Sequence, residues 1–416
     1  MYEKLTIIVF AIIIFSFILD KVLEILNASW YSKPIPRELK GHFEEVEQKG
    51  LDYKKAKFRY SMFNSIVTFI ITFAFWWWGG FGWTNEWVLS ISDNLILQNL
   101  LFFGVIALFS SILSIPFSLY FNFVLEEKFG FNKMTIKTFI LDLLKSTLLT
   151  VVLGGGILTL VVWVYHELPN DFWWIVWIFL SIIMIFMTTF YARLIVPLFN
   201  KQEELQDGEL KTAINNMAIK LGFQLKNIYV MDGSKRSTKA NAYFTGLGSQ
   251  KRIVLFDTLI NDLETDEILA VLAHEIGHYK HKHTLSNILI GLLQTGVMLY
   301  ILSLFINPDS PISLSLNQVI ARDSALTQTH FYLGIIGFGI LYSPISTILS
   351  LLMNLLSRKF EYQADAYAKK AELTEGLVGG LIKLSKNSLS NLNPHPAYVF
   401  VMYSHPPLIN RIRALK

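Results

Sequence analysis

The chain has 416 residues, of which 53% are hydrophobic and only 16% charged, and its formal net charge at pH 7 is +4. Ordinary soluble domains carry about 25% charged residues, so this composition excludes a string of soluble domains and indicates a polytopic membrane protein. The chain has no cysteine, which excludes disulfides, thiolate catalysis and cysteine-bound zinc, and leaves His, Glu and Asp as the strong metal ligands.

Seven stretches are long and apolar enough to cross a bilayer, because a hydrocarbon core of about 30 Å takes roughly 20 helical residues. The apolar core of the first is followed by Asp20 and Lys21 and shows no small-residue cleavage site, so we expect this span to be retained rather than removed as a signal peptide. The predicted spans are residues 5–26, 61–83, 97–121, 138–164, 172–196, 284–306 and 331–356.

The segments between these spans alternate between many basic residues and almost none. The Lys/Arg counts are eight in 27–60, none in 84–96, three in 122–137, none in 165–171, eleven in 197–283, one in 307–330 and nine in 357–416. By the positive-inside rule, this alternation predicts an N-terminus outside and a cytoplasmic side that holds both residues 197–283 and the C-terminus. We expect the membrane to be the bacterial inner membrane, or the endoplasmic reticulum membrane if the source is eukaryotic.

Ionisable residues occur inside the predicted spans, where contact with lipid is costly. Asp142 and Lys145 are three positions apart, so we expect them to pair across one helical turn. Two charged residues at this depth indicate a hydrated interior between the helices. The alternative is a protein of a different class, a transporter, in which these residues bind an ion or solute.

The segment 197–283 is expected to form a small α+β unit. Residues 209–221 have helical periodicity and are followed by Gly222, which suits a helix end. Thr265 suits the N-cap of a second helix whose first turn is acidic. The predicted strands are 226–231, 241–246 and 252–256, the last two joined by a turn at 248–250.

The second helix runs into His274-Glu275-Ile276-Gly277-His278. Residues four apart share a helix face, so His274 and His278 can offer ring nitrogens to one metal ion, and Glu275 can act on a water at that metal as general base. This H-E-x-x-H pattern is typical of zinc hydrolases.

A catalytic zinc site needs a third protein ligand and leaves its fourth position to water. His281 and His283 follow too closely on the same helix to converge with the first two histidines, so we rank them low. Glu361 is the better candidate, and Asp365, four residues later, can accept the free ring N–H of a ligating histidine. The alternative is an exposed acidic pair beside two lysines.

His405 precedes Pro406 and Pro407, which fix the local backbone. It could donate to the oxygen of a carbonyl under attack. The alternative is that this segment merely marks the start of a helix, since proline suits the first helical turn.

With these motifs the chain resembles the type I CAAX prenyl endopeptidases, integral-membrane zinc proteases of the gluzincin class. The resemblance rests on H-E-I-G-H at 274–278, E-Y-Q-A-D at 361–365, N-A-Y at 241–243 and S-H-P-P at 404–407, and on seven spans in this order. It covers nearly the whole chain.

The resemblance implies a mainly α polytopic fold: seven transmembrane helices around a hydrated chamber, capped by a small α+β zinc metalloprotease domain with the H-E-x-x-H helix. It implies one Zn²⁺ per chain, held by His274, His278 and Glu361, with Glu275 as base. Asn241 and His405 would act at the substrate carbonyl, Asp365 with Arg411 would support the site, and Ala242 and Tyr243 would belong to an edge strand that binds the substrate.

We therefore predict a membrane zinc metalloendopeptidase that cuts near the C-terminus of peptide or protein substrates, with or without a prenyl group. The alternatives are a bacterial stress-type quality-control protease, a transporter with a structural metal, and a scaffold whose closed zinc site takes a fourth ligand such as His283.

The expected partners are the substrate and membrane lipids, without nucleic acid. The predicted division is into residues 1–196, 197–283, 284–356 and 357–416.

Overall fold

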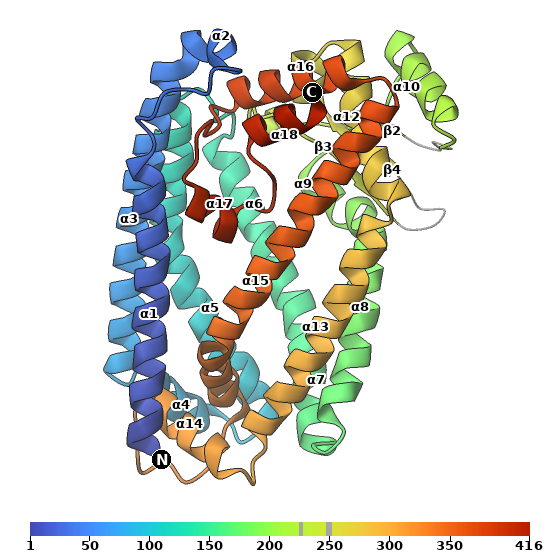
Figure 1. Cartoon of the computed structure of the whole chain (residues 1–416). Coiled ribbons are helices and arrows are strands. Elements are labelled where there is room, and N and C mark those ends of the chain that lie inside the picture. The colour runs from blue at the N-terminus through green and yellow to red at the C-terminus, as the bar shows by residue number, and fades with distance from the viewer. Residues whose placement is uncertain (224–227, 247–251) are drawn as a thin grey trace.

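The computed structural model describes residues 1–223, 228–246 and 252–416. Long helices run the length of the molecule, and a small sheet with short helices lies at one end (Figure 1). The C-terminus lies at that end and the N-terminus at the other, as Figure 1 shows. The chain is mainly helical, which confirms the predicted fold class.

Seven helical segments of the described residues are long and apolar enough to cross a membrane, as predicted. They contain α1 (Tyr2–Ser29), α3 (Glu47–Trp77), α5 (Leu95–Tyr120), α6 with α7 (Ile136–Leu149 and Gly155–Glu167), α8 (Phe172–Leu194), α13 (His283–Ile306) and α15 (Phe331–Lys370). The other helices are α2 (Lys40–Phe43), α4 (Gly80–Ile91), α9 (Val196–Phe199), α10 (Glu209–Lys220), α11 (Asp257–Asp262), α12 (Thr265–Lys280), α14 (Pro311–Ala321), α16 (Thr374–Asn387), α17 (Pro396–Met402) and α18 (Leu408–Leu415), with 3₁₀ turns at Glu44–Val46 and Gly233–Lys235 and π-helical turns at Phe121–Glu126 and Thr150–Gly154.

The long helices differ from the predicted spans in several places. The second span ends at Trp77, because Gly79 adopts a left-handed conformation (φ +80°) and the chain turns into the separate helix α4. A π-helical turn joins α6 to α7 within the fourth span. Most important for the site, α15 does not stop at residue 356 but continues without a break to Lys370.

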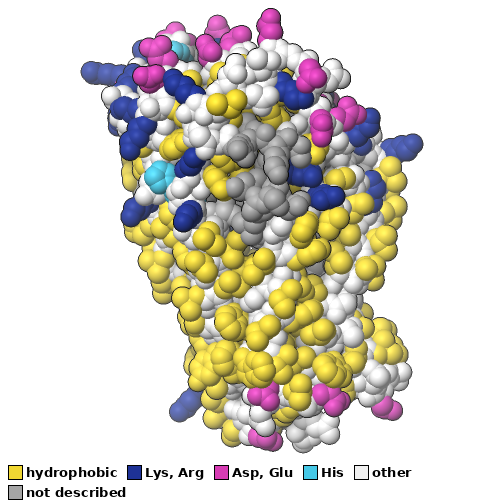
Figure 2. Space-filling model, turned by 90° about the vertical axis from the view of Figure 1, so that its right-hand side faces the viewer, with side chains coloured by type: hydrophobic (Ala, Val, Ile, Leu, Met, Phe, Trp, Pro, Cys, Tyr) yellow, Lys and Arg dark blue, Asp and Glu magenta, His cyan; other side chains and the backbone are white. Residues whose placement is uncertain are grey.

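The surface has the layout of a membrane protein. Figure 2 shows hydrophobic side chains over the middle of the molecule and Lys and Arg side chains gathered towards the end that holds the sheet. Large apolar side chains on the long helices are exposed, among them Phe15, Ile182, Leu293 and Ile348. Because so much apolar surface is stable only against lipid, the chain is a multi-pass integral membrane protein.

The sheet has four strands in the order β1-β2-β4-β3. They are β1 (Gln202–Glu204), β2 (Ile228–Met231), β3 (Ala242–Thr245) and β4 (Arg252–Phe256). Sequence reasoning missed β1, which is short and wholly polar. β2 and β4 are parallel, β3 is antiparallel to β4, and β3 lies at the edge. Residues 226–227 of the first predicted strand, and the predicted turn at 248–250, lie outside the described residues.

Helix α12 is stabilised by a capping box at its N-terminus and by close packing against α15 near its C-terminus. Its N-cap is Glu264 rather than the predicted Thr265: the Glu264 side chain accepts from the backbone of Glu267, and the Glu267 side chain accepts from the backbone of Glu264. Near its other end, a Cβ on Gly277 would lie 3.0 Å from the Cα of Ala364 on α15. A glycine at this position therefore lets α12 and α15 approach closely.

The expected pair of Asp142 and Lys145 does not form. Asp142 instead accepts two hydrogen bonds from the guanidinium of Arg236, at 2.8 and 2.9 Å, and Lys145 donates to the backbone oxygen of Leu198 at 2.7 Å. A planar guanidinium matches both carboxylate oxygens at once, which a lysine cannot do. This ion pair links α6 to the loop after β2. Because the charge of Asp142 is neutralised by Arg236, it is not evidence for a hydrated interior.

Candidate metal centre

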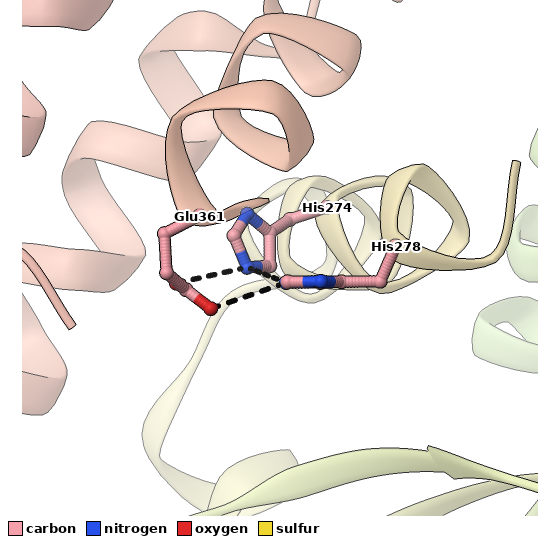
Figure 3. Close-up of side chains that lie close together, drawn as sticks. All are labelled: His274, His278 and Glu361. Atoms are coloured by element: carbon pink, nitrogen blue, oxygen red, sulfur yellow. Dashed lines mark hydrogen bonds and ion pairs between the residues drawn. The ribbon is translucent and has the colours of Figure 1, made fainter. Parts of the chain in front are cut away.

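Three side chains from two helices converge on one point (Figure 3). His274 and His278 lie one turn apart on α12, and Glu361 approaches from α15. The two Nε2 atoms are 3.2 Å apart, and the Glu361 carboxylate lies 3.2 Å from Nε2 of His278 and 3.6 Å from Nε2 of His274. His274 and Glu361 are buried, and His278 is partly exposed.

These distances fit a metal ion. Zinc bonds of about 2.0–2.1 Å in a tetrahedron put neighbouring ligand atoms about 3.4 Å apart. The donor set suits zinc as well, since two imidazole nitrogens and a carboxylate oxygen are borderline ligands. Moreover, three electron-pair acceptors facing one another repel unless a cation lies between them. The site therefore fits the metal that the motif implies.

Asp365 and Arg411 support His274 from the side away from the other two groups. The Nδ1–H of His274 donates to Oδ1 of Asp365 at 2.9 Å. Arg411, on α18, donates to both oxygens of Asp365, at 2.6 and 2.9 Å. The guanidinium also lies 3.6 Å from Glu361, so it offsets part of the negative charge of two buried carboxylates.

His283 is placed differently from the prediction. It does not follow on the H-E-x-x-H helix, because α12 ends at Lys280 and Lys282 adopts a left-handed conformation (φ +57°) before α13 begins. This turn brings the buried His283 back against His278, with their Nδ1 atoms 3.0 Å apart. Sequence spacing gave no signal for this contact, since it depends on the backbone at Lys282.

Glu275 is partly buried on the same helix turn as the two histidines. Burial raises the pKa of Glu275 above its ordinary value, although the neighbouring His274 and His278 act in the opposite direction. A carboxylate of raised pKa is a stronger base, which is what proton abstraction from water requires.

His405 lies beside the three converging groups. Its Nε2 is 3.3 Å from Oε1 of Glu361, and its side chain is 65% exposed, so one face stays open to a ligand. Arg358, one turn before Glu361 on α15, holds this segment by donating to the backbone oxygens of Val399 at 3.1 Å and of Tyr403. Sequence reasoning missed Arg358, because its partners are main-chain atoms.

Asn241 and the edge strand come next to the site but do not join the cluster. The amide oxygen of Asn241 accepts from the N–H of Ala242 at 2.9 Å, and its carbonyl accepts from Phe256 at 3.0 Å. Antiparallel pairs alternate, so residues 241 and 243 turn their N–H and C=O groups towards β4. The groups at the open edge belong to Ala242 and Phe244. The N–H of Tyr243 therefore points towards β4 and not towards the open edge.

A bundle of membrane-spanning helices that brings an H-E-x-x-H helix against a buried glutamate defines a membrane metalloprotease. Comparison with known proteins agrees: the family described as "CAAX prenyl protease N-terminal, five membrane helices" matches residues 24–201, and Peptidase family M48 matches residues 204–416. The chain belongs to the type I CAAX prenyl protease family.

The relatives match along most of their length. CAAX prenyl protease 1 of Saccharomyces cerevisiae is 37% identical over 396 residues, which cover 89% of this chain and 86% of the yeast protein. The homologue of Homo sapiens is 34% identical over 362 residues, covering 77% and 74%. The crystal structure of S. mikatae Ste24p superposes with a TM-score of 0.92 at 35% identity and covers 99% of both chains.

Proposed function

We propose that this membrane metalloprotease is a zinc endopeptidase that cuts peptides close to their C-terminus, with prenylated peptides as the substrate class. The observation that carries the proposal is the convergence of His274, His278 and Glu361 within a chain of the CAAX protease family. The relatives bear the name CAAX prenyl protease, which supports a substrate with a lipid-modified C-terminus.

His274, His278 and Glu361 would hold one zinc ion. A zinc ion held there would supply Lewis acidity, which would lower the pKa of a water molecule towards about 7. Glu275 takes the proton from the attacking water and passes it to the nitrogen of the leaving amine. His405 and Asn241 would donate hydrogen bonds to the carbonyl oxygen as negative charge develops on it.

The open edge of β3 supports an extended substrate. Phe244 presents its N–H and C=O groups there, and Ala242 its C=O group, while the N–H of Ala242 is taken by Asn241. A peptide that adds to this edge as a fifth strand would lie along the sheet with its backbone fixed by main-chain hydrogen bonds. Binding through the main chain accepts many side chains, so specificity must arise elsewhere, and a prenyl group in the helical bundle is one source.

The charge distribution supports an active site on the cytoplasmic side. Lys and Arg side chains gather towards the end that holds the sheet (Figure 2). The basic segments 27–60, 122–137, 197–283 and 357–416 are joined there by hydrogen bonds from Lys239 to Tyr53 and Glu126 and from Lys386 to Glu45. Lipids and a membrane-tethered peptide are the partners that this arrangement favours, and a hydrated space between the helices would receive the peptide.

The other functions weighed from the sequence are less favoured. The relatives that span most of the chain are CAAX prenyl proteases, which argues against both a transporter and a stress-type protease. A closed zinc site would need His283 as a fourth ligand, but its ring lies at Nδ1 of His278, on the side opposite the nitrogen that faces Glu361.

The test is Glu275→Gln in purified protein. This change removes the base and keeps every ligand, so we expect about one zinc per chain, as in the unchanged protein, with cleavage of a prenylated C-terminal peptide lost. Loss of zinc together with activity would place Glu275 among the ligands, and retained cleavage would remove it from the mechanism.

A further inference from the structure

The two histidines that converge with Glu361 are each held at their second ring nitrogen, but by partners of different charge. Nδ1 of His274 donates to the Asp365 carboxylate, which Arg411 binds in turn. Nδ1 of His278 faces Nδ1 of His283 at 3.0 Å. His283 is only 3% exposed, so this contact is shielded from water.

His283 is itself fixed by two residues of α15. Its Nε2 lies 2.9 Å from Oε1 of Gln363, and its ring stacks on Phe360 with centroids 4.0 Å apart and planes inclined by 12°. Both partners flank Glu361 in the sequence. The same stretch of helix that brings Glu361 to the metal centre therefore also holds the residue behind His278.

With a metal bound, the hydrogen bonds that link His278, His283 and Gln363 can be arranged in one consistent way. Nε2 of His278 points at Glu361 and His274, so a metal needs this nitrogen without a proton, and the proton then sits on Nδ1. That N–H donates to Nδ1 of His283, which must be bare. The proton of His283 then sits on Nε2 and donates to Oε1 of Gln363. In this arrangement Oε1 of Gln363, which cannot ionise, accepts the last hydrogen bond and so supports these tautomers of both rings.

A neutral partner is what the charge balance of the site favours. Glu361, Asp365 and Glu275 are already three carboxylates, which the cation of Arg411 and the double charge of a bound zinc ion would balance. A further carboxylate behind His278 would add a buried negative charge beyond that balance, which is costly. An imidazole accepts the same hydrogen bond without that charge.

We propose that His283, with Gln363 behind it, is a positioning residue that fixes the tautomer and the ring orientation of His278 for metal binding. The proposal rests on the metal site assigned under the proposed function. His283 touches neither the metal nor the substrate in this role, and its effect reaches the reaction through His278 alone. In other metal sites, mutation of a residue that hydrogen-bonds a ligating histidine typically lowers the metal affinity about 10–100-fold.

The experiment measures the zinc dissociation constant of purified full-length protein in detergent, by competition with a chelator. His283→Leu keeps the bulk of the ring but offers no acceptor, and we expect zinc to bind about 10–100-fold more weakly. His283→Asn places an amide oxygen near the position of Nδ1, and we expect it to recover most of the affinity. Gln363→Leu leaves the His283 ring free to change tautomer, and we expect an intermediate loss.

His281→Ala is the matched control, because this exposed histidine stacks beside His283 without a hydrogen bond to His278. The His281→Ala variant should bind zinc with the same dissociation constant as the unchanged protein. The thermal melting of the zinc-free proteins is measured in parallel and should be the same for all four variants, which separates a metal-binding effect from a folding defect.

Two outcomes overturn the proposal: unchanged zinc affinity in His283→Leu, or the same loss in His283→Asn as in His283→Leu, which would assign His283 to packing. Weak binding in His283→Leu with a lowered melting point of its zinc-free form would also assign it to packing. If the unchanged protein binds no zinc, the proposed function itself fails, which is a distinct result.

Discussion

Two carboxylates one helical turn apart have different environments in this protein. Glu361 faces Nε2 of both histidines, whereas Asp365 faces Nδ1 of His274 and binds Arg411 through both oxygens. Only the first is placed to touch a metal. The second acts on His274 from behind.

This difference predicts the effect of single substitutions. Glu361→Ala should remove most of the zinc affinity, whereas Asp365→Ala should weaken zinc binding by about 10–100-fold. Glu375, which is exposed in the first turn of α16, is the control, and Glu375→Ala should bind zinc normally. The measurement is the zinc dissociation constant. If His283→Ala abolished binding and Glu361→Ala did not, the choice of third ligand would be wrong.

Sequence reasoning reached part of the site and missed the rest for a physical reason. The proximity of His274, His278 and Glu361 could be predicted, because an i, i+4 pair and a glutamate on the same side of the membrane limit the possibilities. The contacts of His283 and Arg358 could not. One depends on a left-handed backbone at Lys282, and the other on main-chain oxygens that any sequence offers.

At the level of elements, the close approach of α12 and α15 decides whether the three groups meet. A Cβ on Gly277 would lie 3.0 Å from the Cα of Ala364 and 3.0 Å from the Cβ of Tyr367. These are backbone and near-backbone atoms, which cannot move aside without shifting a helix. The glycine in the H-E-I-G-H motif is thus needed for packing rather than for chemistry.

Gly277→Ala should therefore separate the helices. We expect a loss of about 1–3 kcal/mol in stability from overpacking, and weaker zinc binding because Glu361 moves away from the histidines. Gly104→Ala is the control, since a Cβ there meets nothing within 4 Å. Equal melting temperatures and zinc affinities for both variants would contradict this account of α12 and α15.

The open edge of β3 gives a second prediction for an element. A strand bound to Ala242 and Phe244 directs every second N–H towards β3. N-methylation along a peptide substrate should therefore lower kcat/KM with a period of two residues, by about 2- to 10-fold per blocked hydrogen bond of ~0.5–1.5 kcal/mol. A uniform response to methylation along the peptide would mean that the substrate does not add to this edge.

At the level of the whole molecule, the sequence predicted the seven spans because length and apolar character are local properties. It missed α4 and α14, which lie at the N-terminal end of the molecule away from the sheet (Figure 1). These helices are too short to span and are held by distant contacts, such as the hydrogen bond of 2.6 Å from Tyr332 to Asn85. Contacts of this kind cannot be read from local composition.

The predicted orientation can be tested by labelling introduced cysteines, because the chain has none of its own. Asp207 and Asn170 are both exposed, the first beside the sheet and the second between α7 and α8. In sealed vesicles or cells, Asp207→Cys should react with an impermeant thiol reagent only from the cytoplasmic side, and Asn170→Cys only from the opposite side. Reaction of both from one side would overturn the seven-span topology.

The unbroken length of α15 links the enzyme to the physical state of its lipid. At 1.5 Å per residue its 40 residues extend about 60 Å, roughly twice the thickness of the hydrocarbon core. A thinner or thicker bilayer changes the tilt of a spanning helix. Because α15 stays helical past Pro344, part of that change would reach the turn that carries Glu361. We therefore expect acyl-chain length to act on the distance between Glu361 and the histidines, and the close contact at Gly277 to oppose that change.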